Sequence, residues 1–193
     1  TEMDLQLKDK VALITGASRG IGETTAKLLA LHGARVVVNY REGKEDAERV
    51  VSEIKAAGGR ALAVAADVSD HEQVRAMFQE ARRSLGPVTI LVNNAVRDAA
   101  AVPFAELSWD DLQKDLDVVL RGALHCCQEA IPMMLEAKGG KIVNIGTVYT
   151  ENPPPGQAKY VVSKCALAGL TRSLAVEYAP KNIQVNMVAP GLT

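Results

Sequence analysis

Two residues near the end of the chain, Tyr160 and Lys164, have types and a spacing suited to proton transfer. They lie four positions apart in a stretch of helical periodicity, so both side chains occupy one face of the predicted helix. An ammonium beside a phenol stabilises the phenolate and lowers its pKa from about 10, which makes proton exchange with a substrate oxygen feasible near neutral pH. In isolation such a pair is more often a packing residue and a surface charge. The pair therefore predicts chemistry only together with other groups at the same place.

A hydroxyl group is expected beside this pair. Thr147 directly follows a short apolar run, residues 141–146, which predicts a strand. Ligands of open α/β sheets bind at the carboxyl ends of the strands, and Thr147 belongs to that edge. The sequence therefore predicts that the Thr147 hydroxyl, Tyr160 and Lys164 lie at the edge of the sheet where ligands bind.

A glycine-rich turn, TGASRGIG, follows the first predicted strand and leads into a helix near Ile21. Glycine lets the backbone turn tightly and approach a pyrophosphate, and the helix N-terminus offers free N–H groups to that anion. The spacing of Gly16, Gly20 and Gly22 is G-x-x-x-G-x-G, which differs from the commoner G-x-G-x-x-G fingerprint. A strand-to-helix turn also needs glycine for structural reasons alone. Its place after the first strand of an α/β sheet favours nucleotide binding.

The end of the second predicted strand carries Asn39, Tyr40 and Arg41, where an acidic residue would hold the ribose diol of NAD. Arg41 can form charge-assisted hydrogen bonds to a 2′-phosphate, and Arg19 in the glycine turn can reach the same region. The alternative for Arg41 is a solvated loop charge. These residues predict NADP as the cofactor.

Short β-branched runs alternate along the chain with longer segments of helical periodicity. The predicted strands are residues 11–15, 35–40, 61–66, 88–93, 141–146 and 183–189. Strands that alternate with helices form βαβ units, and continuous apolar strands are buried on both faces of a parallel sheet. We therefore expect an α/β fold with a doubly wound parallel sheet in one domain, residues 1–193. A longer helix is expected from Trp109 to Leu135, with Pro132 near its end as a kink or terminus.

Composition narrows the partners. Hydrophobic residues make up 48% of the 193 residues and aromatic residues only 4%, so the core should be aliphatic. With 22 basic and 23 acidic side chains, the chain has no field that would attract nucleic acid or an anionic membrane, and a small-molecule partner is expected. No apolar run is long enough to cross a bilayer, and the polar opening is unlike a secretory signal, so we expect a cytoplasmic protein.

Other residues that could do chemistry are interpreted as structural. The cysteines form no C-x-x-C pair and are expected to be reduced and buried: Cys126, Cys127 and Cys165. The histidines have no paired spacing and predict no metal site: His32, His71 and His125. The acids of the long helix are expected to face water or to cap a helix that Ser108 begins: Asp110, Asp111, Asp115 and Asp117.

Together these motifs resemble the short-chain dehydrogenase/reductase family over the whole chain. TGASRGIG is similar to the family's T-G-x-x-x-G-x-G cofactor turn, and Tyr160 with Lys164 matches Y-x-x-x-K. Thr147, thirteen residues before Tyr160, stands where the family places its catalytic serine. Further matches follow the third, fourth and sixth strands: Asp67-Val68, Asn93-Asn94-Ala95 and Pro190-Gly191. Among subgroups, the chain is most similar to bacterial 3-oxoacyl-(acyl-carrier-protein) reductases, although it ends after the sixth strand, where the family continues.

The resemblance implies a Rossmann-like sheet and hydride transfer from NADPH to a ketone, with a 3-oxoacyl thioester as the preferred substrate. Tyr160 would donate a proton to the carbonyl oxygen, Lys164 would bind the nicotinamide ribose and tune Tyr160, and Thr147 would hydrogen-bond the carbonyl oxygen. A homodimer or homotetramer that pairs the long helix is also implied. The implied contacts to NADP(H) are Gly16, Ser18, Arg19, Gly20, Ile21, Gly22, Asn39, Tyr40, Arg41, Asp67, Val68, Asn94, Ala95, Tyr160, Lys164, Pro190, Gly191 and Thr193.

Two alternatives stay open: the same chemistry on a sugar, steroid or small alcohol, and a weakly catalytic NADP-binding partner subunit. The second is motivated by departures from the family pattern. Val96 replaces a glycine after the fourth strand, Gly146 replaces the first serine of a pair, and Val119 replaces the asparagine that anchors a proton-relay water. The retained Tyr160 and Lys164 argue for an enzyme.

Overall fold

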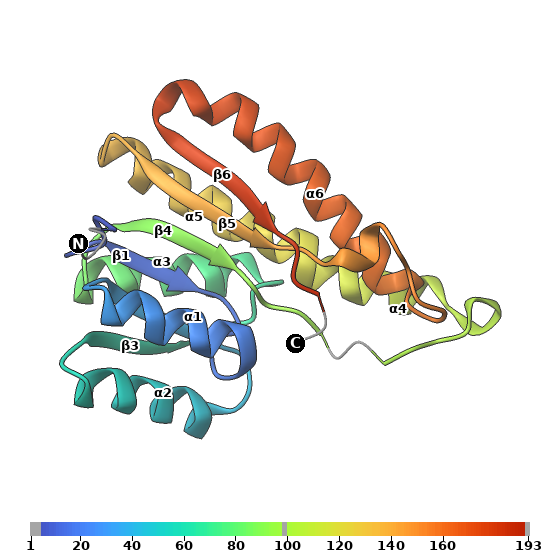
Figure 1. Cartoon of the computed structure of the whole chain (residues 1–193), viewed down its shortest axis with the longest axis horizontal. Helices are drawn as coiled ribbons and strands as arrows, with labels where there is room; N and C mark the ends of the chain where they lie inside the picture. The colour runs from blue at the N-terminus through green and yellow to red at the C-terminus, as the bar shows by residue number, and fades with distance from the viewer. Residues whose placement is uncertain (1–4, 98–99, 192–193) are drawn as a thin grey trace.

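The computed structural model describes residues 5–97 and 100–191, and it has the predicted α/β architecture (Figure 1). Within these residues a six-stranded parallel sheet has the order β3-β2-β1-β4-β5-β6. The strands are β1 (Val11–Ile14), β2 (Arg35–Tyr40), β3 (Arg60–Ala65), β4 (Val88–Asn93), β5 (Gly140–Ile145) and β6 (Ile183–Val188). The strand order reverses between β1 and β4, which is the switch point where open α/β sheets bind ligands.

Helices cover the two faces of the sheet. They are α1 (Gly20–Leu31), α2 (Lys44–Ala56), α3 (His71–Ser84), α4 (Trp109–Leu116), α5 (Gly122–Glu136) and α6 (Ala158–Tyr178). The α1 and α2 helices pack on one face, and α3, α5 and the end of α6 pack on the other. Both cores are mainly aliphatic, as predicted, and Phe78, in the core beneath α3 and α5, is the largest fully buried side chain of the described residues.

The strands differ in how completely they are buried. Every residue of β1 is buried, as predicted for a strand covered on both faces. The prediction is wrong for β6, in which Gln184 and Asn186 are exposed and alternate with buried Ile183 and Val185. Buried and exposed residues alternate along β6, so within the described residues only one face of this strand is covered.

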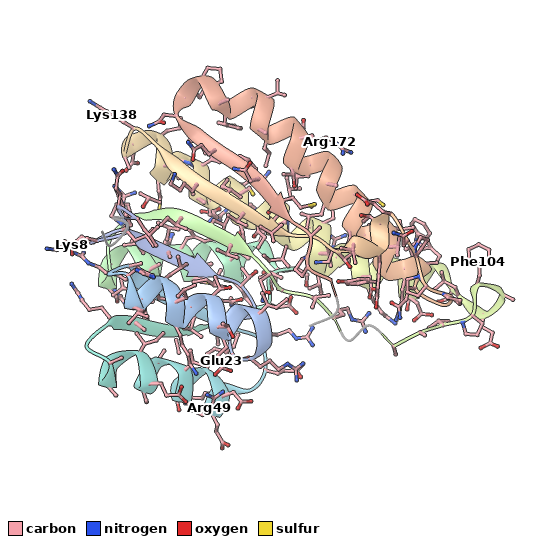
Figure 2. All side chains as sticks on the ribbon, viewed as in Figure 1. Lys8, Glu23, Arg49, Phe104, Lys138 and Arg172 are labelled. Atoms are coloured by element: carbon pink, nitrogen blue, oxygen red, sulfur yellow. The ribbon has the colours of Figure 1, made fainter. Side chains whose placement is uncertain are left out.

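An ion-pair cluster joins α1 to α2 next to the glycine turn (Figure 2). Arg49 Nη1 of α2 lies 2.9 Å from Glu23 Oε1 in the first turn of α1. Lys27 contacts the same Glu23 oxygen at 2.6 Å, and the hydrogen bonds from Arg49 and Lys27 lower the pKa of Glu23 to about 2. The cluster connects α2 to the first turn of α1, where the glycine turn ends.

The expected long helix runs from residue 109 but is not a regular α-helix throughout. A π-helical turn, η2 (Asp117–Arg121), separates α4 from α5, and Pro132 lies inside α5 rather than ending it. Ser108 caps α4 as predicted, because its hydroxyl accepts a hydrogen bond from the Asp111 N–H at 3.1 Å. A π turn rotates the residues that follow and often lies at a functional site.

Two expectations about single residues are wrong. Cys126 and Cys127 are buried as predicted, but Cys165 is exposed on α6. Asp115 was expected to face water, yet only 3% of the residue is exposed, because α4 packs this side against α6. Among the described residues no histidine, cysteine and acid cluster could hold a metal. No helix in that part of the chain is long and apolar enough to cross a membrane.

Candidate active site

A cavity of about 770 Å³ opens at the carboxyl edge of the sheet, beside the β1–β4 switch point. Its wall is formed by the glycine turn and by the segments that follow β2, β3 and β4. The predicted cofactor contacts that line it are Gly16, Ser18, Arg19, Gly20, Ile21, Asn39, Tyr40, Arg41, Asp67, Val68, Asn94 and Ala95. Tyr160, Lys164, Gly22, Pro190 and Gly191 do not line this cavity, and Thr193 lies outside the described residues.

The glycine turn fits an anion at the start of α1. Gly20 has φ +58°, and a Cβ atom built there would meet nothing within 4 Å, so this backbone faces open space in the cavity wall. Gly22 serves a different purpose, because its Cβ would lie 2.6 Å from Asn94 Nδ2. Gly22 therefore permits close packing of α1 against the segment after β4, and Gly20 leaves the helix N-terminus open to a phosphate.

Thr15 and Asn94 join the glycine turn to the segment after β4. Thr15 Oγ1 accepts hydrogen bonds from the N–H groups of Asn94 at 2.9 Å and Ala95 at 3.0 Å. In return, Asn94 Nδ2 donates to the carbonyl oxygens of Thr15 and Gly16 at 2.9 and 3.0 Å. Sequence reasoning missed Thr15, although a threonine that ends a strand just before a glycine turn is a signal for this arrangement.

Asn39 of β2 also forms a hydrogen bond with the glycine turn. Its Oδ1 accepts the Gly16 N–H at 3.2 Å, and its Nδ2 donates to the Ala66 carbonyl at 3.1 Å. The residue is 2% exposed. Its side chain is thus engaged within the protein, and Tyr40 and Arg41 are left at the end of β2 to contact a ligand.

Arg41 is the exposed cation of this part of the cavity, with acids close by. Its side chain is 51% exposed, and its Nη2 lies 2.9 Å from Glu42 Oε1. Its Nη1 lies 3.8 Å from Asp67 Oδ2. Exposed pairs of this kind are weak and exchange readily with water, so the guanidinium stays available to a stronger anion such as a phosphate.

The structure brings the three predicted catalytic residues together. Thr147 follows β5 and is buried, and it lies close enough to the Tyr160 side chain to lower the pKa of that phenol. Lys164 Nζ lies 5.6 Å from the centroid of the Tyr160 ring and donates a hydrogen bond to the Ile145 carbonyl at 2.6 Å. A Cβ atom built at Gly146, which precedes Thr147, would lie 2.8 Å from Met187 Sδ of β6, so a larger residue there would require the Met187 side chain to move.

The expected lowering of the Tyr160 pKa is wrong for the protein alone. Burial raises the pKa of Tyr160, and the Thr147 side chain only partly opposes this effect. Burial also lowers the pKa of Lys164 to about 8. Burial therefore shifts both groups toward their neutral forms, but Lys164 still carries its proton near pH 7. Its ammonium donates to the Ile145 carbonyl.

Three buried polar side chains form a chain of hydrogen bonds between the elements that carry the site. Sequence reasoning did not predict this chain. Asn93 Nδ2 donates to Asn144 Oδ1 at 2.8 Å, and Asn144 Nδ2 donates to Thr171 Oγ1 at 2.8 Å. This chain links β4, β5 and α6, the elements that precede or carry the catalytic residues. Buried amides joined in this way help to fix the relative positions of the elements that carry them, and Asn93 Oδ1 is left without a hydrogen-bond partner among the described residues.

The fold is one that binds nucleotides at its switch point, and comparisons with known proteins identify the family of this chain. The family model for short chain dehydrogenases matches residues 10–193. The 3-oxoacyl-(acyl-carrier-protein) reductase FabG of Staphylococcus aureus is 46% identical over 184 residues, which cover 94% of this chain and 74% of the relative. The 3beta-hydroxysteroid dehydrogenase 1 of Eggerthella lenta is 42% identical over 186 residues, which cover 96% of this chain and 71% of the relative.

A solved structure agrees with this assignment. Gluconate 5-dehydrogenase from Burkholderia cenocepacia, crystallised with NADP and tartrate, superposes with a TM-score of 0.88 at 36% identity, over 95% of this chain and 71% of its own. The chain therefore belongs to the short-chain dehydrogenase family. It is an oxidoreductase of the family that uses a nicotinamide cofactor.

Proposed function

We propose that this protein is an NADPH-dependent reductase that converts a ketone to an alcohol, with a 3-oxoacyl thioester as its substrate. The observation that carries the proposal is the meeting of Thr147, Tyr160 and Lys164 beside the cavity of the glycine turn. Arg19 and Arg41 line that cavity and support NADP over NAD. The similarity to FabG of Staphylococcus aureus supports the thioester substrate.

The chain's own residues would divide the work as follows. The glycine turn and the start of α1 bind the pyrophosphate, and Arg19 and Arg41 hold the 2′-phosphate. The bound nicotinamide supplies the hydride. Tyr160 donates its proton to the ketone oxygen, and Thr147 hydrogen-bonds the same oxygen. Lys164 binds the nicotinamide ribose and steadies the Tyr160 side chain.

Reduction of a sugar or steroid is the second candidate, because named relatives include a steroid dehydrogenase and a gluconate dehydrogenase. The assay that separates the candidates follows NADPH oxidation with a short 3-oxoacyl thioester, a sugar ketone, a steroid ketone and a simple monoketone. The proposal expects the largest kcat/KM for the thioester. A larger value for the sugar or the steroid would overturn the substrate assignment.

Tyr160→Phe tests the chemistry in the same assay. The variant loses only the hydroxyl, so turnover should fall by at least about 10²-fold, the lower range for general acid catalysis, while NADPH binding is kept. Turnover near that of the parent protein would show that another group supplies the proton.

A further inference from the structure

A second phenol, Tyr149, lies beside Tyr160 and has no place in the proposed mechanism. It belongs to the short helix η3 (Val148–Thr150), two residues after Thr147. The ring centroids of Tyr149 and Tyr160 are 6.4 Å apart with an interplanar angle of 79°, an edge-to-face contact. The proximity is close enough for Tyr149 to contribute to the raised pKa of Tyr160.

The Tyr149 backbone is held rigidly against the catalytic threonine. Its N–H donates to Thr147 Oγ1 at 3.2 Å, and the Thr150 hydroxyl donates to the Thr147 carbonyl at 3.0 Å. The Val148 N–H donates to the Pro190 carbonyl at 3.1 Å, which ties η3 to the segment after β6. These bonds fix the backbone from which the Tyr149 ring extends toward Tyr160.

The two phenols differ in what their hydroxyl groups contact. Thr147 lies close enough to the Tyr160 hydroxyl to lower its pKa, whereas no side chain within residues 5–97 and 100–191 forms a hydrogen bond with the Tyr149 hydroxyl. Tyr149 is half-buried, so part of the residue is accessible to a ligand. A phenol is neutral near pH 7 and offers one strong donor. The site therefore holds one donor committed to proton transfer and one uncommitted donor next to it.

We propose that Tyr149 is a specificity-determining residue that donates a hydrogen bond to a second carbonyl oxygen of the substrate, on a carbon that is separated from the ketone carbon by one further carbon atom. This inference rests on the proposed function, because Tyr160 and Thr147 must hold the ketone oxygen first. In a 1,3-dicarbonyl compound both oxygens can point to one edge of the molecule, as two adjacent phenol donors require. A 3-oxoacyl thioester is such a compound, and a monoketone is not.

Tyr149→Phe tests the inference, because it keeps the ring, the edge-to-face contact and the backbone bond to Thr147. Steady-state kinetics would be compared for a short 3-oxoacyl thioester, a simple 1,3-diketone and a monoketone of similar size. The kcat/KM should fall about 3- to 12-fold for both 1,3-dicarbonyl compounds, the loss expected for one neutral hydrogen bond, and stay unchanged for the monoketone. The loss should lie mainly in KM if the bond is made in the ground state as well.

Two readouts separate this role from a structural one. The Kd for NADPH and the melting temperature should be unchanged in Tyr149→Phe. Tyr178→Phe, at the far end of α6, is the matched control and should leave all three substrates unaffected. An equal fall for the three substrates, or no fall for any, would overturn the inference.

The same experiment keeps the inference distinct from the proposed function. If the parent protein reduces the diketone and the monoketone but not the thioester, the thioester assignment fails. The role of Tyr149 is then still decided by the difference between diketone and monoketone in the variant.

Discussion

Burial shifts the pKa values of individual side chains in this site. Lys164 is 2% exposed, and removing its ammonium from water lowers its pKa to about 8. The Ile145 carbonyl compensates for part of this cost by accepting a hydrogen bond from Nζ at 2.6 Å. A cation held in this way is ready to donate to further oxygens, such as the hydroxyls of a ribose, without leaving its place.

The burial of Lys164 predicts a pH-dependent stability. Because the folded protein holds the ammonium less readily than the unfolded chain, the penalty is complete below pH 8 and disappears as the pH approaches 10.5. Its size is on the order of 3 kcal/mol at most, from 1.36 kcal/mol for each pKa unit. Thermal unfolding of the parent protein and of Lys164→Met should therefore show the parent gaining stability relative to the variant between pH 8 and 10. Parallel curves would contradict this account.

The exposed guanidinium of Arg41 predicts a preference for NADPH over NADH. If its guanidinium exchanges Glu42 and Asp67 for a 2′-phosphate, NADPH should bind more tightly than NADH by roughly 1.5–3 kcal/mol. Arg41→Ala should weaken NADPH binding by about tenfold or more and leave NADH binding nearly unchanged. Fluorescence titrations measure both constants, with Arg172→Ala on the outer side of α6 as the control (Figure 2). Equal constants for the two cofactors in the parent protein would refute the preference.

At the scale of elements, the strands and the glycine turn were predictable because their signals are local. Each predicted strand agrees with the structure to within a residue or two at its ends, since short β-branched runs bounded by turns specify little else. The π turn and the burial of Asp115 were not predictable. Both depend on how α4 meets α6, and helical periodicity carries no information about that contact.

The candidate site divides in the same way. Motif spacing predicted which residues reach the carboxyl edge, because parallel strands end there together. It did not predict that the side chains of Asn39 and Asn94 form hydrogen bonds within the protein, or that the ring of Tyr149 contacts that of Tyr160. Those relations join residues distant in sequence or depend on the path of an irregular loop. They needed the three-dimensional structure.

Val119 lies in the π-helical turn η2, and its burial predicts the outcome of the substitution Val119→Asn. Val119 is 3% exposed and packs in a small apolar cluster with Ala123 and Leu167. A relay water needs polar partners, and an amide placed here would be buried without them. Val119→Asn should therefore cost roughly 1–3 kcal/mol of stability with no gain in turnover. Val119→Thr, of nearly the same shape, is the milder control.

Two measurements decide this prediction. Chemical denaturation gives the change in the free energy of unfolding, and steady-state kinetics give turnover. Higher turnover in Val119→Asn would show that a relay water can be held there after all.

At the scale of the whole molecule, α5 presents a face that suits assembly with another copy of the chain. Leu124 and Leu135 are 39% and 41% exposed and lie about three turns apart on this face, with Gln128 and Pro132 between them. We propose that this stripe pairs with its copy in a homodimer or a larger homo-oligomer. In a two-fold interface the same patch serves both subunits, so a charge introduced on the stripe meets its own copy or apolar surface.

Light scattering at micromolar concentration should therefore give a mass of two or four chains for the parent protein. Leu124→Glu should shift this mass toward one chain, because it buries an unpaired carboxylate in each copy of the interface. Circular dichroism should show an unchanged fold, since the side chain is exposed within a single chain. Leu31→Glu, at the exposed end of α1 on the opposite face of the sheet, is the matched control and should leave the mass unchanged. A monomeric parent protein, or an oligomer equally weakened by both changes, would rule out α5 as the assembly face.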